Sequence, residues 1–146
     1  MKVKIAVVAL IGLASLGLYD SKLRAQDGGR SVWDGVYTKE QADSGRGLYA
    51  KECGSCHGDQ LTGGEMAPAL AGGDFLSNWN GLSVGALFDR IRTSMPLNKP
   101  GSLSRDTNAD ITAFILSSNS FPAGSAKLDT RSEVLATIKL EASKGK

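Results

Sequence analysis

The feature that most constrains this chain is a pair of cysteines, Cys53 and Cys56, followed directly by His57. C-x-x-C-H is the attachment signature of a c-type haem. On a helical turn, two thiols at this spacing can each add to one vinyl group on the edge of a porphyrin. The histidine is then placed to ligate the iron through its imidazole. The motif predicts one covalently bound haem c per chain.

Three other kinds of site could use the same residues. A structural zinc site needs four Cys or His ligands, and here a carboxylate or a second chain would have to complete the set, because His57 is the only histidine. A thioredoxin-like redox pair is expected beside a β-α-β pattern, which does not flank this motif. A plain disulfide is the third alternative. Covalent haem is favoured because a rigid planar cofactor requires this spacing.

Residues 1–25 have the form of an export signal. Lys2 and Lys4 precede an apolar run from Ile5 to Leu18, and a short polar stretch ends at Ala25, a small residue suited to cleavage. The apolar run is too short to span a bilayer comfortably, although an uncleaved membrane anchor is the competing interpretation. We therefore expect an exported, periplasmic bacterial protein, with membrane contact only if the signal is retained.

Removal of the signal changes the charge balance of the chain. The whole sequence has 17 basic and 15 acidic residues. The signal holds four of the basic residues and one of the acidic residues, so the rest of the chain has 13 basic and 14 acidic residues and a net charge of −1. A nucleic-acid partner therefore has no electrostatic support. The 121 residues that follow position 25 are enough for one small domain.

Capping signals and apolar spacing predict three helices. Thr38 to Gln41 has the form of a capping box, in which Thr38 accepts from the amide three residues on and Gln41 reaches back, and the helix should run to about Glu52. Ser83 caps a second helix, which ends before Pro96. A third is expected over residues 106–118.

The segments around these helices are less regular. Residues 26–35 read as a leader, residues 58–73 as a Gly-rich loop, and residues 121–146 as a C-terminal tail that wraps around the domain or docks a partner. The apolar patch from Val134 to Leu140 is expected to form a short strand or helix. On the first helix, Gly45 permits close approach of another helix.

Counting restricts the sixth ligand of the iron. Ligation by two histidines of the chain is excluded because His57 is alone, and Met1 leaves with the signal. Met66 lies nine residues past His57 in the Gly-rich loop, where it could hardly reach the opposite face of the ring. Met95 follows a helix that can carry the chain across the haem, so His57 and Met95 are the predicted metal ligands; an open or water-bound iron is the alternative.

Over residues 36–120 the chain resembles class I cytochromes c, the small soluble electron carriers. The resemblance implies an all-α fold packed around one haem, in which the first and last helices cross at Gly45. It also implies that the carbonyl of Pro68 accepts the imidazole N–H of His57, that Leu70 packs on the ring and that Trp79 meets a propionate. The matching segments are Gly45 and Tyr49, Cys53 to His57, Ala67-Pro68-Ala69-Leu70, Ser94-Met95-Pro96, and the helix with Ile111, Ala113 and Phe114.

A narrower resemblance concerns the partner. Segments 32–38, 100–104 and 119–124 are similar to those of bacterial cytochromes associated with quinoprotein (PQQ) alcohol dehydrogenases. This resemblance implies a periplasmic electron carrier, not an enzyme, that accepts single electrons from such a dehydrogenase and passes them towards a terminal oxidase or another cytochrome of the respiratory chain. The alternatives are a cytochrome subunit of a larger dehydrogenase complex, and a haem-based ligand-binding protein or peroxidase.

Overall fold

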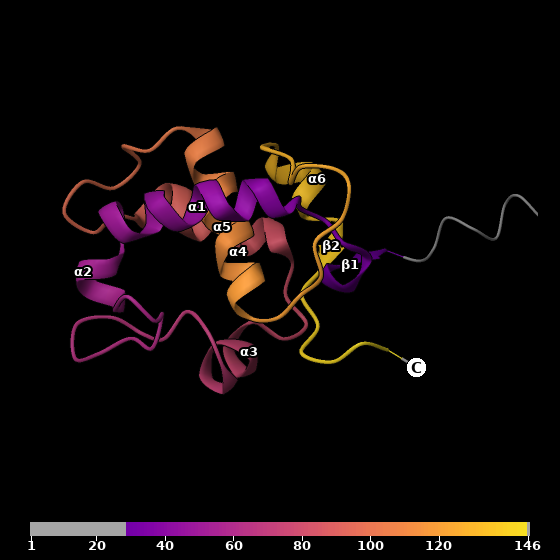
Figure 1. Cartoon of the computed structure of the whole chain (residues 1–146), viewed down its shortest axis with the longest axis horizontal. Helices are drawn as coiled ribbons and strands as arrows, with labels where there is room; N and C mark the ends of the chain where they lie inside the picture. The colour runs from indigo at the N-terminus through magenta and orange to yellow at the C-terminus, as the bar shows by residue number, and fades with distance from the viewer. Residues whose placement is uncertain (1–28, 146) are drawn as a thin grey trace, which may run out of the picture.

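The computed structural model describes residues 29–145, which fold into a mostly helical domain (Figure 1). This confirms the expected all-α class; the predicted signal lies outside the described residues. No helix between residues 29 and 145 has the length and apolar character needed to cross a membrane. The elements are β1 (Arg30–Ser31), the 3-10 helix η1 (Val32–Asp34), α1 (Lys39–Glu52), α2 (Gly54–His57), α3 (Gly73–Trp79), α4 (Val84–Ser94), α5 (Arg105–Ser118), α6 (Ser132–Leu135) and β2 (Ile138–Lys139).

Helix α1 begins as predicted, but only half of its capping box forms. The hydroxyl of Thr38 accepts from the backbone N–H of Gln41 at 3.2 Å. The Gln41 side chain does not reach back to Thr38. It is buried, accepts from the N–H of Leu128 at 2.7 Å and donates to the carbonyl of Leu128 at 3.3 Å. The predicted reciprocal bond is wrong because the C-terminal tail offers this amide two buried partners.

Helices α1 and α5 cross at Gly45, as the sequence predicts. A Cβ on Gly45 would overlap the carbonyl of Asp110 and lie 3.0 Å from the Cβ of Phe114. Beside this contact, the rings of Tyr49 and Phe114 pack with their centroids 5.3 Å apart. The crossing therefore depends on the absence of a side chain at residue 45.

Both later helices have serine caps, of which the sequence predicted only Ser83. The Ser83 hydroxyl accepts from the N–H of Ala86 at 3.1 Å at the start of α4, and Ser104 accepts from Thr107 at 3.1 Å at the start of α5. Each serine satisfies an amide that has no partner within the helix. Helix α5 begins one residue earlier than expected.

The short helix α3 was not predicted. It follows Gly72, has no side-chain cap and spans only seven residues, so none of the usual start signals marks it. It is held by tertiary packing instead. Phe75 is fully buried and stacks on Trp79, with ring centroids 6.1 Å apart.

The leader and the tail pack against each other at the end of the molecule far from α2 (Figure 1). Strand β1 pairs in parallel with β2, and the indole N–H of Trp33 donates to the carbonyl of Glu141 at 3.0 Å. The apolar patch of the tail forms both a helix, α6, and a strand, β2. Its residues Leu135, Ile138 and Leu140 are almost fully buried, so the tail wraps around the domain and uses its apolar side chains within the chain.

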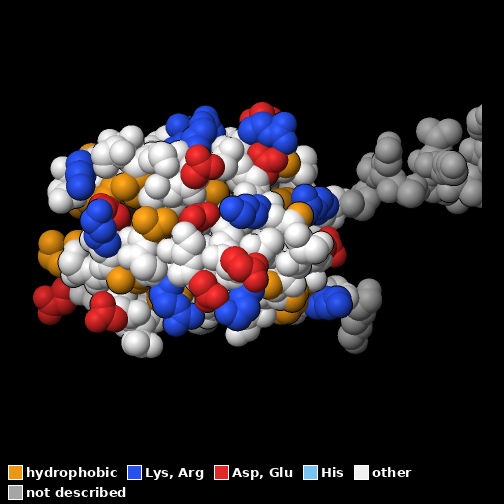
Figure 2. Space-filling view, turned by 45° about the horizontal axis from the view of Figure 1, so that its top comes forward, with side chains coloured by type: hydrophobic (Ala, Val, Ile, Leu, Met, Phe, Trp, Pro, Cys, Tyr) orange, Lys and Arg blue, Asp and Glu red, His pale blue; other side chains and the backbone are white. Residues whose placement is uncertain are grey.

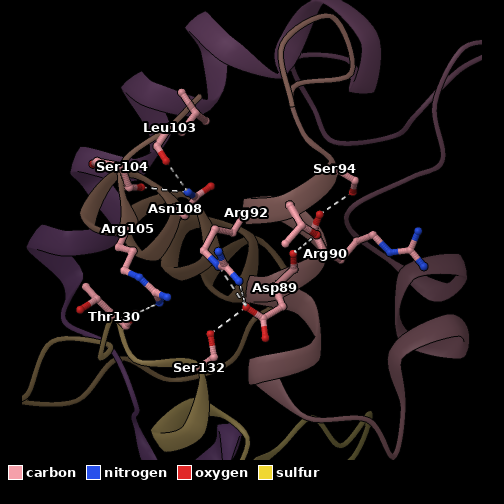
Figure 3. Close-up of polar contacts among 11 residues, drawn as sticks. Asp89, Arg90, Arg92, Ser94, Leu103, Ser104, Arg105, Asn108, Thr130 and Ser132 are labelled. Atoms are coloured by element: carbon pink, nitrogen blue, oxygen red, sulfur yellow. Dashed lines mark hydrogen bonds and ion pairs between the residues drawn. The ribbon is translucent and has the colours of Figure 1, made fainter. Parts of the chain in front are cut away.

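Asp89 joins α4 to the tail (Figure 3). Its carboxylate accepts from the hydroxyl of Ser132 at 2.7 Å and from the guanidinium of Arg92 at 3.1 Å. These bonds stabilise the charged form, so the pKa of Asp89 lies below its ordinary value of 3.8, with Ser132 as the larger cause.

Candidate haem site

The end of α1 places both cysteines on one turn. Cys53 closes α1 through an N–H bond to the carbonyl of Tyr49 at 2.8 Å, and its own carbonyl accepts from Cys56 at 3.2 Å and from His57 at 3.0 Å. The three predicted attachment residues therefore lie on α2 and its N-cap. A single turn presents two thiols and an imidazole together, which is the arrangement required for thioether attachment and proximal ligation.

The two thiols have different surroundings. Cys53 is half-buried and Cys56 is exposed, and neither is in a disulfide. Burial, with smaller contributions from Glu52 and Cys56, raises the pKa of the Cys53 thiol to about 11. Reactive redox cysteines have lowered pKa values, so the environment of Cys53 does not favour a thioredoxin-like role.

The imidazole of His57 is fixed by a single hydrogen bond. Its Nδ1 lies 2.8 Å from the carbonyl oxygen of Pro68, and the ring is buried. A carbonyl only accepts, so Nδ1 carries the proton and Nε2 keeps its lone pair. A bond of this kind orients a ligating imidazole and raises its basicity. The expected partnership of His57 with Pro68 is thus present in the geometry.

Tyr49 supports the attachment turn from α1. Its hydroxyl donates to the carbonyl of Gly58 at 2.7 Å, directly after His57. Burial, together with the nearby Cys53 and Asp59, raises the pKa of Tyr49 to about 12. The phenol therefore stays neutral and keeps its proton for this bond at physiological pH.

The two methionines that could complete the iron site differ sharply in exposure. Met66 is 82% exposed in the loop after His57. Met95 is half-buried at the C-cap of α4, where it packs against the apolar core. The N–H of Met95 donates to the carbonyl of Ile91 at 3.0 Å, which fixes the point where the chain leaves the helix. The half-buried position of Met95 and the exposed position of Met66 favour Met95 as the candidate sixth ligand of the iron.

The other expected contact residues lie on separate elements. Leu70 is at the end of the loop that begins after His57, and Trp79 is at the end of α3; both are half-buried and pack against the core. The structure supports an apolar role for Leu70. Trp79 stacks on Phe75, and its contact with a propionate stays a prediction.

Charges of both signs surround the attachment turn. Glu52, next to Cys53, pairs with Lys51 at 3.4 Å and with Lys99 at 3.6 Å, so it links the end of α1 to the loop that follows Met95. On the face drawn in Figure 2, Lys and Arg are interspersed with Asp and Glu. No single sign of charge dominates this face.

The sequence analysis missed the roles of two buried polar residues, one beside the site and one at the opposite end of α1. Gln41 binds the tail, and Asn119, just after α5, binds the backbone of the loop that carries Pro68 and Leu70. Neither role has a local sequence signal, because each side chain bonds to backbone groups far away along the chain. A buried amide at the end of a helix is the clue that the structure adds.

The donor set fits a haem c. Cys53 and Cys56 supply two thiols on one turn, and His57 keeps a free lone pair on Nε2 because Nδ1 is bonded to Pro68. Within residues 29–145, no group of three or more His, Cys, Asp and Glu side chains is arranged to hold a bare metal ion. The two thiols and the free Nε2 suit the vinyl groups and the iron of a porphyrin.

The fold and the site define a c-type cytochrome, and comparison with known proteins agrees. Residues 40–115, just over half of the chain, match the family described as cytochrome C oxidase, cbb3-type, subunit III. The chain belongs to this cytochrome c family, its cofactor is haem c, and its function is electron transfer.

Two further similarities were found. The chain is 38% identical over 87 residues to the thiosulfate dehydrogenase of Stutzerimonas stutzeri (strain A1501). The match covers 53% of this chain and 27% of that protein. The chain is also similar to the sulfane dehydrogenase SoxCD from Paracoccus pantotrophus, with 30% identity and a TM-score of 0.47, over 61% of this chain and 53% of that one. The chain thus spans about a quarter of the curated relative and about half of the solved chain.

Proposed function

We propose that this cytochrome is a periplasmic monohaem carrier whose iron is ligated by His57 and Met95. The observation that carries the proposal is the 2.8 Å bond between Nδ1 of His57 and the carbonyl of Pro68, which leaves Nε2 for the iron. The half-buried position of Met95 against the core supports its choice over the exposed Met66. The periplasmic location rests on the signal-like residues 1–25.

Bound haem c supplies a one-electron couple, and a thioether ligand raises its potential. The protein residues do the remaining work. Cys53 and Cys56 retain the cofactor, Pro68 orients the imidazole of His57, and Leu70 contributes apolar surface. If His57 and Met95 both held the iron of bound haem c, no coordination site would be left for a substrate, and the chain would act as a carrier and not as an enzyme.

The proposed electron donor is a quinoprotein dehydrogenase. Support comes from the segments that carry the narrower sequence resemblance, two of which meet in the fold: the rings of Trp33 and Phe121 contact each other edge to face at 5.1 Å. These segments have a structural use as wrapping around the core. Reduction by the dehydrogenase tests whether they also recognise a partner.

A second candidate is a cytochrome subunit or domain that serves a dehydrogenase of sulfur compounds. The similarity to the thiosulfate dehydrogenase of Stutzerimonas stutzeri favours it. In both cases the chain would accept single electrons from an oxidising centre elsewhere. The two candidates differ in the donor and not in the chemistry of this site.

The first experiment tests the haem site itself. Intact mass of the mature protein after denaturation and acid-acetone extraction should show one haem added and no free thiol. The visible spectrum of the reduced protein should stay unchanged under carbon monoxide, because Met95 holds the sixth position. Haem that extracts freely would contradict covalent attachment, and rapid binding of carbon monoxide would favour a ligand-binding protein.

The second experiment identifies the donor. Stopped-flow reduction of the oxidised cytochrome is measured with a quinoprotein alcohol dehydrogenase plus alcohol, and separately with a thiosulfate dehydrogenase plus thiosulfate, both from the source organism. Fast reduction in the first case supports the quinoprotein partner. Fast reduction only in the second transfers the assignment to the sulfur-compound enzyme, and reduction in neither removes both partners while leaving the carrier role intact.

A further inference from the structure

Asn119 is a buried amide with every one of its strong hydrogen-bonding groups engaged. It follows α5 and is 8% exposed. Its Oδ1 accepts from the N–H of Gly72 at 3.0 Å, and its Nδ2 donates to the carbonyls of Leu70 at 3.0 Å and Ile115 at 2.9 Å. One side chain therefore joins the end of α5 to the backbone of residues 70–72.

The segment that Asn119 holds is the end of the loop that begins after His57. The N–H groups of Leu70 and Ala71 both donate to the carbonyl of Leu61, at 2.8 and 3.2 Å. This bond pair closes the loop on itself, while the two bonds from Asn119 attach the closed loop to α5. Residues 70–72 are thus fixed from two sides.

Pro68 lies two residues before the fixed segment, and little freedom remains between them. Gly63 is packed so closely against the loop that a Cβ there would lie 2.5 Å from the N of Ala69 and 2.7 Å from the carbonyl carbon of Pro68. The N–H of Gly63 in turn donates to the carbonyl of His57 at 2.9 Å. A displacement of residues 70–72 would therefore be transmitted to the carbonyl of Pro68, which accepts the hydrogen bond from Nδ1 of His57.

We propose that Asn119 is a positioning residue for the proximal side of the haem. By attaching residues 70–72 to α5, it fixes the carbonyl of Pro68 and, through it, the orientation of the His57 imidazole. The inference rests on the proposed role of His57 as an axial ligand. It adds that α5, through the residue at its C-cap, determines the alignment of that ligand, although no residue of α5 belongs to the attachment motif.

Asn108, within α5, provides a matched comparison for Asn119, which is the C-cap of that helix. Asn108 is fully buried, and its Nδ2 donates to the carbonyls of Leu103 at 3.1 Å and Ser104 at 2.9 Å (Figure 3). Those carbonyls belong to the loop after Met95 and not to the loop after His57. Asn108→Ala would take the side-chain donor from the carbonyl of Leu103, and Asn119→Ala would take it from the carbonyl of Leu70. Either loss destabilises the fold, but only Asn119 connects to the loop that carries Pro68.

The test uses the reduced holoprotein, in which the exchange of the His57 Nδ1 proton with solvent is followed by NMR. In Asn119→Ala we expect exchange to accelerate by about tenfold or more, the order of one lost hydrogen bond. In Asn108→Ala, the Nδ1 exchange rate should stay within about twofold of that in the unsubstituted protein. The two variants are compared under conditions in which their thermal stability is lowered by the same amount. Equal acceleration in both variants would reduce Asn119 to a general structural role, and an unchanged rate in Asn119→Ala would overturn the proposal.

Two additional measurements keep the test decisive if Asn119→Ala does not fold. Asn119→Ser, which is smaller but keeps a polar group, should show the same acceleration of Nδ1 exchange. In the unsubstituted protein, the amide of Gly72 should exchange more slowly than that of Gly73, which begins α3 and has no partner within the helix. Equal exchange rates for the two glycines would refute the hydrogen bond by which Asn119 holds Gly72. A visible spectrum of the unsubstituted protein without His57 ligation would refute the proposed function instead.

Discussion

Gly45 on α1 lies directly against the carbonyl of Asp110 on α5, with no room for a side chain between the two helices. Gly45→Ala should therefore push the helices apart and lower the free energy of unfolding by about 3 kcal/mol through overpacking. Gly47, two residues along the same helix, has nothing within 4 Å of the position of a Cβ. Gly47→Ala should raise stability by about 1 kcal/mol, because glycine is a poor helix former.

Denaturant unfolding of the two glycine variants measures this difference. Similar stabilities for Gly45→Ala and Gly47→Ala would contradict the close crossing of α1 and α5. The comparison is stringent because the same substitution is made twice on one helix, and only the contact with α5 differs.

Met95→Ala should abolish the weak long-wavelength absorption band that iron–thioether ligation gives in the oxidised protein, because the proposed sixth ligand is removed. Met66→Ala should leave the band in place, since the Met66 side chain is 82% exposed. Absorption spectra of the two oxidised variants decide the matter. Loss of the band in Met66→Ala alone would move the ligand to the loop after His57.

Gln41→Ala should release part of the tail from α1. The substitution leaves the buried N–H and carbonyl of Leu128 without partners, which should lower the free energy of unfolding by about 2 kcal/mol. Trypsin should then cut after the exposed Lys127 faster than in the unsubstituted protein. Glu40→Ala, at an exposed neighbouring position, should change neither quantity; equal effects of the two substitutions would show that Gln41 does not anchor the tail.

Asp89→Asn should destabilise the protein at neutral pH, with a difference that disappears in acid. The pKa of Asp89 is lowered on folding, chiefly by Ser132 and then by Arg92. Its carboxylate therefore contributes stability above the ordinary value of 3.8, and this contribution is lost as the pH falls through the lower pKa of the folded state. Thermal unfolding of both proteins across this range measures the difference.

Ser132→Ala is the companion variant for Asp89. It removes the larger cause of the lowered pKa, so it should reduce the pH-dependent part of the stability without removing the carboxylate. A stability difference between the unsubstituted protein and Asp89→Asn that is independent of pH would mean that packing, and not charge, explains the role of Asp89.

Reduction by the proposed dehydrogenase should depend only modestly on salt. The chain that follows residue 25 has a net charge of −1, and the face in Figure 2 mixes both signs. We therefore expect the stopped-flow rate to fall by less than about tenfold between low and physiological ionic strength, as weak charge steering implies. A steep fall would show that a local cluster of charge controls the encounter.

The helices were predictable because their signals are local. Thr38 and Ser83 each accept a hydrogen bond from an amide three residues on, so the residues that start these helices are neighbours in the sequence. Helix α5 was expected from the spacing of its apolar residues, and its Ser104 cap was not recognised. Helix α3 has no such cap and is held by the burial of Phe75, and for that reason it had no counterpart in the sequence analysis.

The sequence by itself determined the attachment of haem c, because Cys53, Cys56 and His57 lie within one helical turn and their spacing is fixed by their order in the chain. Only the tertiary structure decided how that turn is held. The amide of Gln41 bonds to a residue 87 positions away, and that of Asn119 to one 49 positions away. A polar side chain could satisfy its hydrogen bonds in many ways, and its partner is chosen by which backbone groups folding buries beside it.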